Sequence, residues 1–258
     1  MMPRLLPGWA TWWVWLAVAC LAGCGGGEPA SQAPAAPAAA PTDTADGPGT
    51  IAGTMTYDGS APAPRPLPMD SDPRCVMEPG AKSELLLVGP GNTLQNVFVY
   101  VKDGLGARTY ASPTTPVMLD QKGCRYLPHV FGVQIGQPIH VANSDPTVHN
   151  VNASAKNNRS FNFGQVPSVP PVTRIFDKPE VMIPFRCDVH GWMNAYVGVV
   201  AHPFFAVTMA DGTFEIKGLP AGTFTVEAWH ERLGVQSQSV TVDGKTPAKV
   251  SFAFKAAT

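Results

Sequence analysis

Apolar residues recur at every second position in many short stretches of this chain, and turn-forming residues separate these stretches. Residues 51–57 (IAGTMTY) alternate in this way and stop at Asp58-Gly59. Such alternation is typical of strands with one buried face, and an Asp-Gly pair favours a tight turn. The same pattern predicts further strands at 84–88, 96–102, 131–142 (two strands that meet at Gly136), 181–186, 195–201, 213–217, 223–229, 238–242 and 249–254.

Long helices are not indicated anywhere after residue 49, because no segment there shows a sustained apolar repeat of 3.6 residues. The composition agrees, with 27 Pro and 25 Gly but only 14% charged residues. Many turn-formers and few charges favour short strands. We therefore predict an all-β protein made of β-sandwiches, and the length fits two sandwiches better than one.

The first residues have the features of an export signal. Arg4 supplies a positive charge, an apolar run covers 11–20, and the sequence Leu21-Ala22-Gly23-Cys24 follows. The run is too short to span a bilayer comfortably. Small residues before a cysteine at this place resemble a lipobox, in which Cys24 becomes the lipidated first residue of a bacterial lipoprotein. The alternative is an ordinary secretory signal that is cut elsewhere.

We predict that residues 1–23 are removed and that lipid on Cys24 holds an exported protein at the membrane. In lipoproteins an Asp after this cysteine favours the inner membrane, so Gly25 favours the outer membrane, facing the periplasm or the cell surface. Residues 24–49 are rich in Ala, Pro and Gly and predict a disordered tether. The net charge of −1 gives no basic field that would attract nucleic acid.

The segment 205–226 carries the run D-G-T-F-E-I-K-G-L-P-A-G-T-F. It resembles the carboxypeptidase regulatory-like, transthyretin-like module, with Phe224 where Tyr is common. The opening strand of that family is similar to residues 49–55 (GTIAGTM). The resemblance implies a smaller β-sandwich in which the first strands of this chain join the last ones.

Metal-binding side chains gather in the run Cys187-Asp-Val-His190-Gly-Trp-Met193, and His149-Asn150 lies upstream. A thiolate, two imidazoles and a thioether suit copper that alternates between Cu(I) and Cu(II). Zinc would accept the same Cys and His residues, but its structural sites usually have four strong ligands.

These residues resemble the plastocyanin and pseudoazurin branch of the cupredoxins, and residues 126–137 are similar to the strand before the first ligand in that family. The resemblance covers about 124–200. It implies a Greek-key β-sandwich that holds one copper ion through His149, Cys187 and His190, with Met193 as the fourth ligand. It also implies that Asn150 ties the two ligand loops together.

The ligand loop departs from the family, which has C-x2-H-x4-M where this chain has C-x2-H-x2-M. The dinuclear copper centre of cytochrome oxidase uses H-x2-M, but it needs a second cysteine in the loop, and this chain has Asp188 and Val189 there. We therefore predict a mononuclear centre whose colour differs from a plain blue spectrum.

Ordinary structural roles are the alternatives for each residue. A lone Cys or Met in a sandwich is usually a core residue, and His149 could simply end a strand. His129 could be a further ligand or a surface acid–base group, but we favour packing at the surface or in a loop. We expect structural roles for His140, His202 and His230.

Three of the five cysteines stay in the mature domain, in an oxidising compartment. An odd number leaves one thiol outside disulfides. Cys187 stands beside His and Met and is assigned to the metal, so Cys75 and Cys124 are expected to pair and to add about 2–4 kcal/mol of stability.

These inferences give a cupredoxin-like domain at 113–203 between a β segment at 50–112 and a regulatory-like module at 204–258. The leading function is one-electron transfer to or from a redox protein, without enzymatic activity, because no nucleophile elbow, P-loop or dinucleotide fingerprint is present. One alternative is copper storage, delivery or sensing. Another is carbohydrate or protein binding by the C-terminal sandwich, with copper incidental.

Overall fold

The computed structural model describes residues 47–76 and 80–255. The predicted signal peptide, Cys24 and most of the predicted tether lie outside the described residues. Within the described part, no helix has the length and apolar character needed to cross a membrane.

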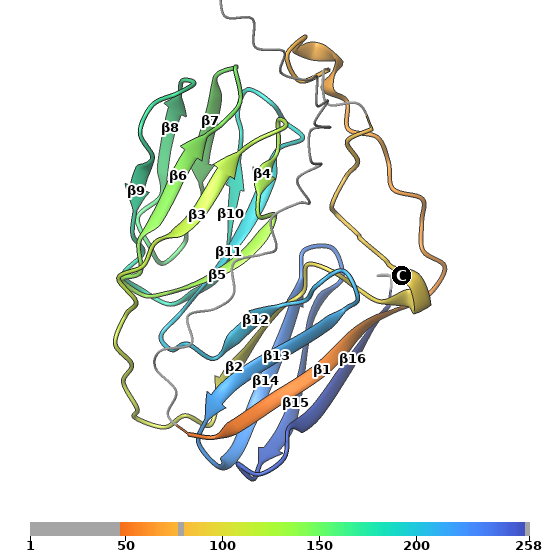
Figure 1. Cartoon of the computed structure of the whole chain (residues 1–258), viewed down its shortest axis with the longest axis vertical. Helices are drawn as coiled ribbons and strands as arrows, with labels where there is room; N and C mark the ends of the chain where they lie inside the picture. The colour runs from red at the N-terminus through yellow and green to blue at the C-terminus, as the bar shows by residue number, and fades with distance from the viewer. Residues whose placement is uncertain (1–46, 77–79, 256–258) are drawn as a thin grey trace, which may run out of the picture. The chain divides into compact units, whose positions relative to one another are not determined.

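Strands make up nearly all of the regular structure, as the alternating pattern predicted (Figure 1). Two short 3-10 helices, η1 (Met69–Ser71) and η2 (Pro90–Asn92), are the helical elements of the described chain. The strands are β1 (Gly49–Asp58), β2 (Phe98–Asp103), β3 (Val117–Gln121), β4 (Tyr126–Leu127), β5 (Val130–Gln134), β6 (Ile139–Asn143), β7 (His149–Ala153), β8 (Phe161–Gln165), β9 (Val172–Arg174), β10 (Glu180–Arg186), β11 (Asn194–Val200), β12 (Phe205–Val207), β13 (Thr213–Leu219), β14 (Gly222–His230), β15 (Gly234–Val242) and β16 (Ala248–Lys255).

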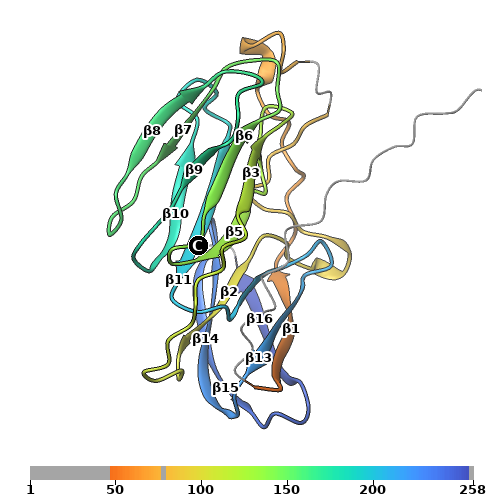
Figure 2. The same ribbon diagram turned by 60° about the vertical axis from the view of Figure 1, so that its left-hand side comes forward.

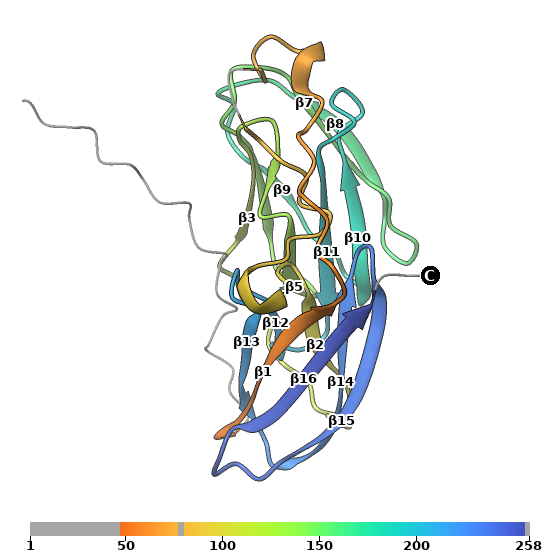
Figure 3. The ribbon, with the colours of Figure 1, turned by 90° about the vertical axis from the view of Figure 1, so that its right-hand side faces the viewer.

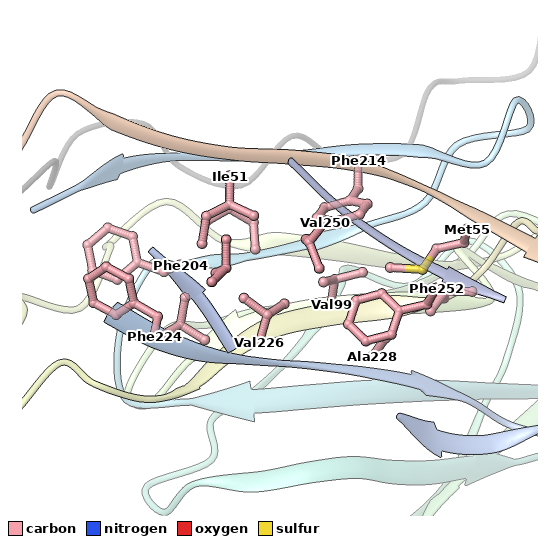
Figure 4. Packing of buried hydrophobic residues seen from close by; sticks show 14 of the residues in the cluster. Ile51, Met55, Val99, Phe204, Phe214, Phe224, Val226, Ala228, Val250 and Phe252 are labelled. Carbon is pink, nitrogen blue, oxygen red and sulfur yellow. The ribbon is translucent and has the colours of Figure 1, made fainter. Parts of the chain in front are cut away.

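One sandwich combines the first strands of the described chain with the last ones. Its sheets have the strand orders β13-β1-β16 and β12-β2-β14-β15. The inward residues of both sheets are apolar and form one buried cluster, which Figure 4 shows closely packed. Its members include Ile51, Met55, Val99, Phe204, Phe214, Phe224, Val226, Ala228, Val250 and Phe252.

The second sandwich is formed by the part of the sequence between β2 and β12 (Figure 2). Its sheets have the strand orders β5-β11-β10-β7-β8 and β4-β3-β6-β9. Its core contains Phe131, Ile183, Phe185 and Val197, together with Cys187 and Met193. The second sandwich is therefore an insertion in the sequence of the first.

Two paired glycines make the contact between the sandwiches possible. Gly132 of β5 stands opposite Gly198 of β11. A Cβ atom would lie 2.4 Å from the ring of Phe205 at the first glycine and 2.3 Å from the ring of Phe98 at the second. Both distances are clashes, so the absence of a side chain at these two positions leaves room for the two aromatic rings. Both rings belong to a buried cluster that contains residues of both sandwiches.

The connection between β1 and β2 carries η1 and runs along the second sandwich (Figure 3). A disulfide joins Cys75 of this connection to Cys124. Both cysteines are buried with Met69, and Trp192 packs against them. The connection is thereby fastened next to the loop that contains Cys187 and His190.

The strand prediction failed at 84–88, which forms only an isolated bridge at Val88–Leu94. Its apolar residues are used for packing, since Leu86 is buried in the first sandwich. Conversely, β3, β7, β8, β9 and β12 were not predicted. Polar residues interrupt β7 and β8, and β9 and β12 have three residues each, too few to show alternation.

Candidate metal centre

Three adjacent strands bring the ligand residues together. His149 is the first residue of β7, Cys187 follows the end of β10, and Met193 precedes β11. β10 pairs with both β7 and β11, with Arg186 opposite Asn152 and Asn194. Residues far apart in sequence therefore meet at one end of this sheet.

The donor atoms of His149, Cys187 and His190 lie within 4.8 Å of one another. The Nδ1 atoms of the two imidazoles are 2.9 Å apart, and Cys187 Sγ is 3.9 Å from His190 Nδ1. All three side chains are buried. The site is a closed cluster of two nitrogens and one sulfur.

Several hydrogen bonds favour the thiolate form of Cys187. Burial alone would raise the pKa of this thiol, but a hydrogen bond from His149 and backbone N–H groups lower the pKa overall. The N–H groups of Asn150 and His190 donate to Sγ at 3.4 and 3.3 Å. A thiolate is the form of cysteine that binds metals.

Each imidazole is held at its outer nitrogen by a carboxylate. His149 Nε2 is 2.8 Å from Asp145 Oδ2, and His190 Nε2 is 3.1 Å from Asp72 Oδ2. Carboxylates in this position orient the ring and leave the other nitrogen free for a metal. Asp145 also accepts the N–H groups of Gly123 and Cys124 at 2.7 and 2.8 Å, so its own position is fixed.

The pKa values of the two imidazoles shift in opposite directions. Burial would lower the pKa of His149, but its contacts with Asp145 and Cys187 raise it to about 9. The pKa of His190 is lowered, because burial and the neighbouring His149 outweigh its hydrogen bond to Asp72. Two imidazoles that face each other across 2.9 Å do not both carry protons easily, and a cation between them would remove this conflict.

Asn150 links the two ligand loops. Its Oδ1 accepts the N–H of Asp188 at 3.1 Å, and its Nδ2 donates to Asn162 Oδ1 at 2.6 Å. The hydroxyl of Tyr126 donates to the backbone oxygen of Asn150. These bonds tie β7, β8 and the loop after β10 into one unit around Cys187.

Met193 is buried in the same cluster as Cys187. Its N–H donates to the backbone oxygen of His190 at 2.9 Å, and its own oxygen accepts the N–H of Cys187 at 3.2 Å. These bonds close the loop into a compact turn. The role of the Met193 sulfur as a ligand stays a prediction.

The donor set fits one metal ion. Donor atoms that bind the same first-row metal at about 2.0–2.3 Å stand roughly 3–4 Å apart, which is close to the separations found here. Two further groups, Asp72-Cys75-His190 and Cys124-Asp145-His149, also bring three metal-binding side chains together. Each of them contains a cysteine of the disulfide, which cannot bind as a thiolate.

The remaining histidines lie elsewhere. His129 is buried in the loop between β4 and β5 and contacts Glu231, so the expectation of a surface position was wrong and that of loop packing is confirmed. His140 lies within β6, and His230 is buried at the end of β14. Burial lowers the pKa of both His202 and His230 to about 4, which keeps them neutral.

Sequence reasoning missed three residues that contact the candidate ligands. Asp145 stands four residues before His149, a spacing that could have indicated the pair. Asp72 comes from a connection with no recognisable motif. Trp192, whose ring centroid is 5.1 Å from that of His190, was read only as part of the loop.

Comparisons with known proteins give structural likenesses only. No protein-family model and no curated protein matches the chain. One similar structure is the Cu-containing nitrite reductase from Thermus scotoductus SA-01, with 17% identity, a TM-score of 0.31, and coverage of 38% of this chain and 25% of the reductase. The chain thus spans about a quarter of that protein's length.

Two smaller proteins are matched over nearly their whole length. The purple cupredoxin from Nitrosopumilus maritimus has 17% identity and a TM-score of 0.28, covering 32% of this chain and 98% of that protein. Amicyanin from Paracoccus versutus has 18% identity and a TM-score of 0.30, covering 39% of this chain and 96% of that protein.

Proposed function

We propose that this chain binds one copper ion through His149, Cys187 and His190 and carries single electrons. The observation that carries this proposal is the convergence of two imidazole Nδ1 atoms and one thiolate-favouring Sγ in a buried cluster. Such a donor set is soft enough for Cu(I) and still suits Cu(II). Bound copper supplies the one-electron change.

The surrounding residues fix the donor atoms. Asp145 and Asp72 hold the outer nitrogens of the imidazoles, and two backbone N–H groups hold Cys187 Sγ. Side chains that are fixed from outside need little rearrangement when the charge at the centre changes. This rigidity favours electron transfer over storage or delivery, which require ready release of the metal.

We further propose that the carrier works while anchored by lipid on Cys24 and exchanges electrons with a redox protein. The export signal and the lipobox-like run support the first point. An oxidising compartment agrees with the disulfide between Cys75 and Cys124.

The test is titration of the metal-free protein with Cu(II), followed by absorption spectroscopy. We expect one copper per chain and a charge-transfer band from the cysteine sulfur. Cys187→Ala should abolish the band, and His149→Ala should weaken copper binding sharply. His140→Ala is the matched control, because this imidazole lies on β6 outside the site. Failure of the reduced wild-type protein to bind copper would overturn the proposal, and rapid loss of copper to a chelator would favour delivery.

A further inference from the structure

An open cavity of about 530 Å³ lies beside the metal centre and takes no part in it. One wall comes from the connection between β1 and β2, at 65–68 and 82–85, and the other from Arg125, His129 and residues 191, 192 and 194. A volume of this size is within the range of small-molecule sites, roughly 300–1,000 Å³.

The charged side chains of the cavity are mainly positive. Arg65, Lys82 and Arg125 line it, against a single carboxylate, that of Glu84. None of the three cations forms an ion pair with a residue that the structure describes. Arg125 Nε is shielded from solvent and has no hydrogen-bond partner in the described chain.

Apolar groups form much of the remaining lining, beside the polar Ser83, His129 and Asn194. They are Pro66, Leu67, Pro68, Leu85 and the Trp192 ring. The indole N–H of Trp192 donates to the backbone oxygen of Cys124 at 2.9 Å, which fixes the ring in the wall. An occupant therefore meets an aromatic and aliphatic surface together with uncompensated positive charge. Apolar walls with a few placed polar groups are typical of sites for organic ligands.

We propose that this cavity binds a small organic anion, with its carboxylate or similar acidic group at Arg65, Lys82 and Arg125 and its ring or chain against Trp192 and Leu85. The proposal uses no metal ligand and does not depend on the proposed copper function. Arginine and lysine bind anionic groups through charge-assisted hydrogen bonds, which are stronger than neutral ones.

The location adds a consequence for the metal centre. Trp192 forms part of the cavity wall, and its ring centroid is 5.1 Å from that of His190. His190 itself is buried, so a small molecule reaches Trp192 rather than the imidazole. An occupant of the cavity therefore lies one side chain away from the candidate ligand.

The test is calorimetric titration of the metal-free protein with benzoate, compared with its neutral analogue benzamide. We expect saturable binding of one benzoate and at least tenfold weaker binding of benzamide. Arg125→Gln and the double variant Arg65→Gln/Lys82→Gln should each weaken benzoate binding about tenfold or more, as loss of a charge-assisted hydrogen bond predicts.

Lys249→Gln is the matched control, because it removes an exposed positive charge on β16, outside the cavity. Arg65 and Lys82 are exposed, so their replacement should leave the fold intact. Absence of saturable benzoate binding, equal binding of benzamide, or an equal loss in Lys249→Gln overturns the proposal. Each of these results leaves the copper titration unaffected, so the two proposals fail separately.

Discussion

At the scale of single residues, the two histidines of the candidate centre each have a metal-facing nitrogen and an outer nitrogen held by a carboxylate. Asp145 contacts His149, and Asp72 contacts His190. Such carboxylates set the ring orientation and increase the basicity of the inner nitrogens, so they would contribute to the affinity of the proposed centre without touching the metal.

Replacement of Asp145 by Asn should therefore lower copper affinity about 10–100-fold while the fold persists. The N–H groups of Gly123 and Cys124 donate to different oxygens of Asp145, so Asn keeps an acceptor for one of them and has no negative charge. Competition with a chelator of known affinity measures the effect. Asp120→Asn, which removes a carboxylate bonded to Ser144 instead of a histidine, should have wild-type affinity. Unchanged affinity in Asp145→Asn would mean that this carboxylate serves only the loop at residues 123 and 124.

Met193→Leu tests the fourth ligand of the proposed centre. Leucine has a similar volume and keeps the buried cluster filled, but it has no sulfur. Copper should stay bound, and the reduction potential should rise because an axial donor is lost. Voltammetry and the absorption spectrum measure both effects. If neither changes, Met193 is a packing residue and the ion has three ligands or another axial group.

The sequence indicated the ligand residues because their chemistry is unusual within a short run, C-x2-H-x2-M, and a His-Asn pair precedes it. The structure brings His149, Cys187 and His190 together. Asp72 could not be found in this way, because its contact with His190 depends on the path of a connection that shows no periodicity. An isolated aspartate among turn-forming residues has no sequence pattern that would predict its contact with a histidine.

At the scale of elements, the loop between β7 and β8 is held by Glu180 at the start of β10. Its carboxylate accepts the N–H groups of Lys156, Asn157 and Asn158 at 2.6, 2.9 and 3.0 Å. Burial would raise the pKa of Glu180, but these bonds lower it overall. The charged form is therefore favoured by folding.

Glu180→Gln should destabilise the protein by about 1–3 kcal/mol at neutral pH, because N–H groups lose a charged acceptor. The contribution of Glu180 is fully present above the ordinary glutamate pKa of 4.5 and is lost as pH falls through the lower pKa of the folded state. The difference between wild type and variant in urea unfolding should therefore shrink below about pH 4.5. A difference that is the same at pH 7 and pH 3 would contradict this assignment.

Two of the strands that the sequence did not predict, β7 and β8, share a physical cause. β7 and β8 have alternating burial, but Asn and Gln occupy several positions, because hydrogen bonds around Asn150 and Gln165 replace apolar contacts there. Segment 84–88 shows the opposite case. Its Leu86 and Val88 pack against the core of the first sandwich, yet its backbone pairs only at Val88. The pattern of apolar residues indicates which side chains are buried. It does not show whether a partner strand is available for backbone hydrogen bonds.

At the scale of the whole molecule, the lipid anchor predicted at Cys24 lies outside the described residues and stays a prediction. Cys24→Ser should release the protein from membranes or leave an uncleaved precursor, since attached lipid chains supply most of the affinity of such proteins for a bilayer. Membrane fractionation and mass spectrometry of the mature N-terminus measure the outcome. An unmodified mature N-terminus at another residue would contradict the assignment of the lipobox.

The all-β class could be predicted from apolar alternation and composition. Both are averaged over many segments, so a wrong prediction for one segment does not change the predicted class. The contact between the two sandwiches could not be predicted from the sequence. It depends on single positions such as Gly132 and Gly198, where a missing side chain admits an aromatic ring from another part of the sequence. A glycine in a strand is equally compatible with a bulge, a turn or such a close approach, so only the folded arrangement distinguishes them.

The parallel pairing of β1 with β16, from Ile51–Ala248 to Asp58–Lys255, has a consequence for biogenesis. During synthesis from the N-terminus β1 emerges early, but both strands that flank it, β13 and β16, emerge late. The inserted sandwich is complete when β11 has emerged and can form first. Until β13 and β16 have emerged, β1 has two open edges, which are the surfaces at which strands pair wrongly. A chain that stops before β16 would therefore have a complete inserted sandwich, with its candidate metal centre, attached to an unfinished and aggregation-prone sandwich.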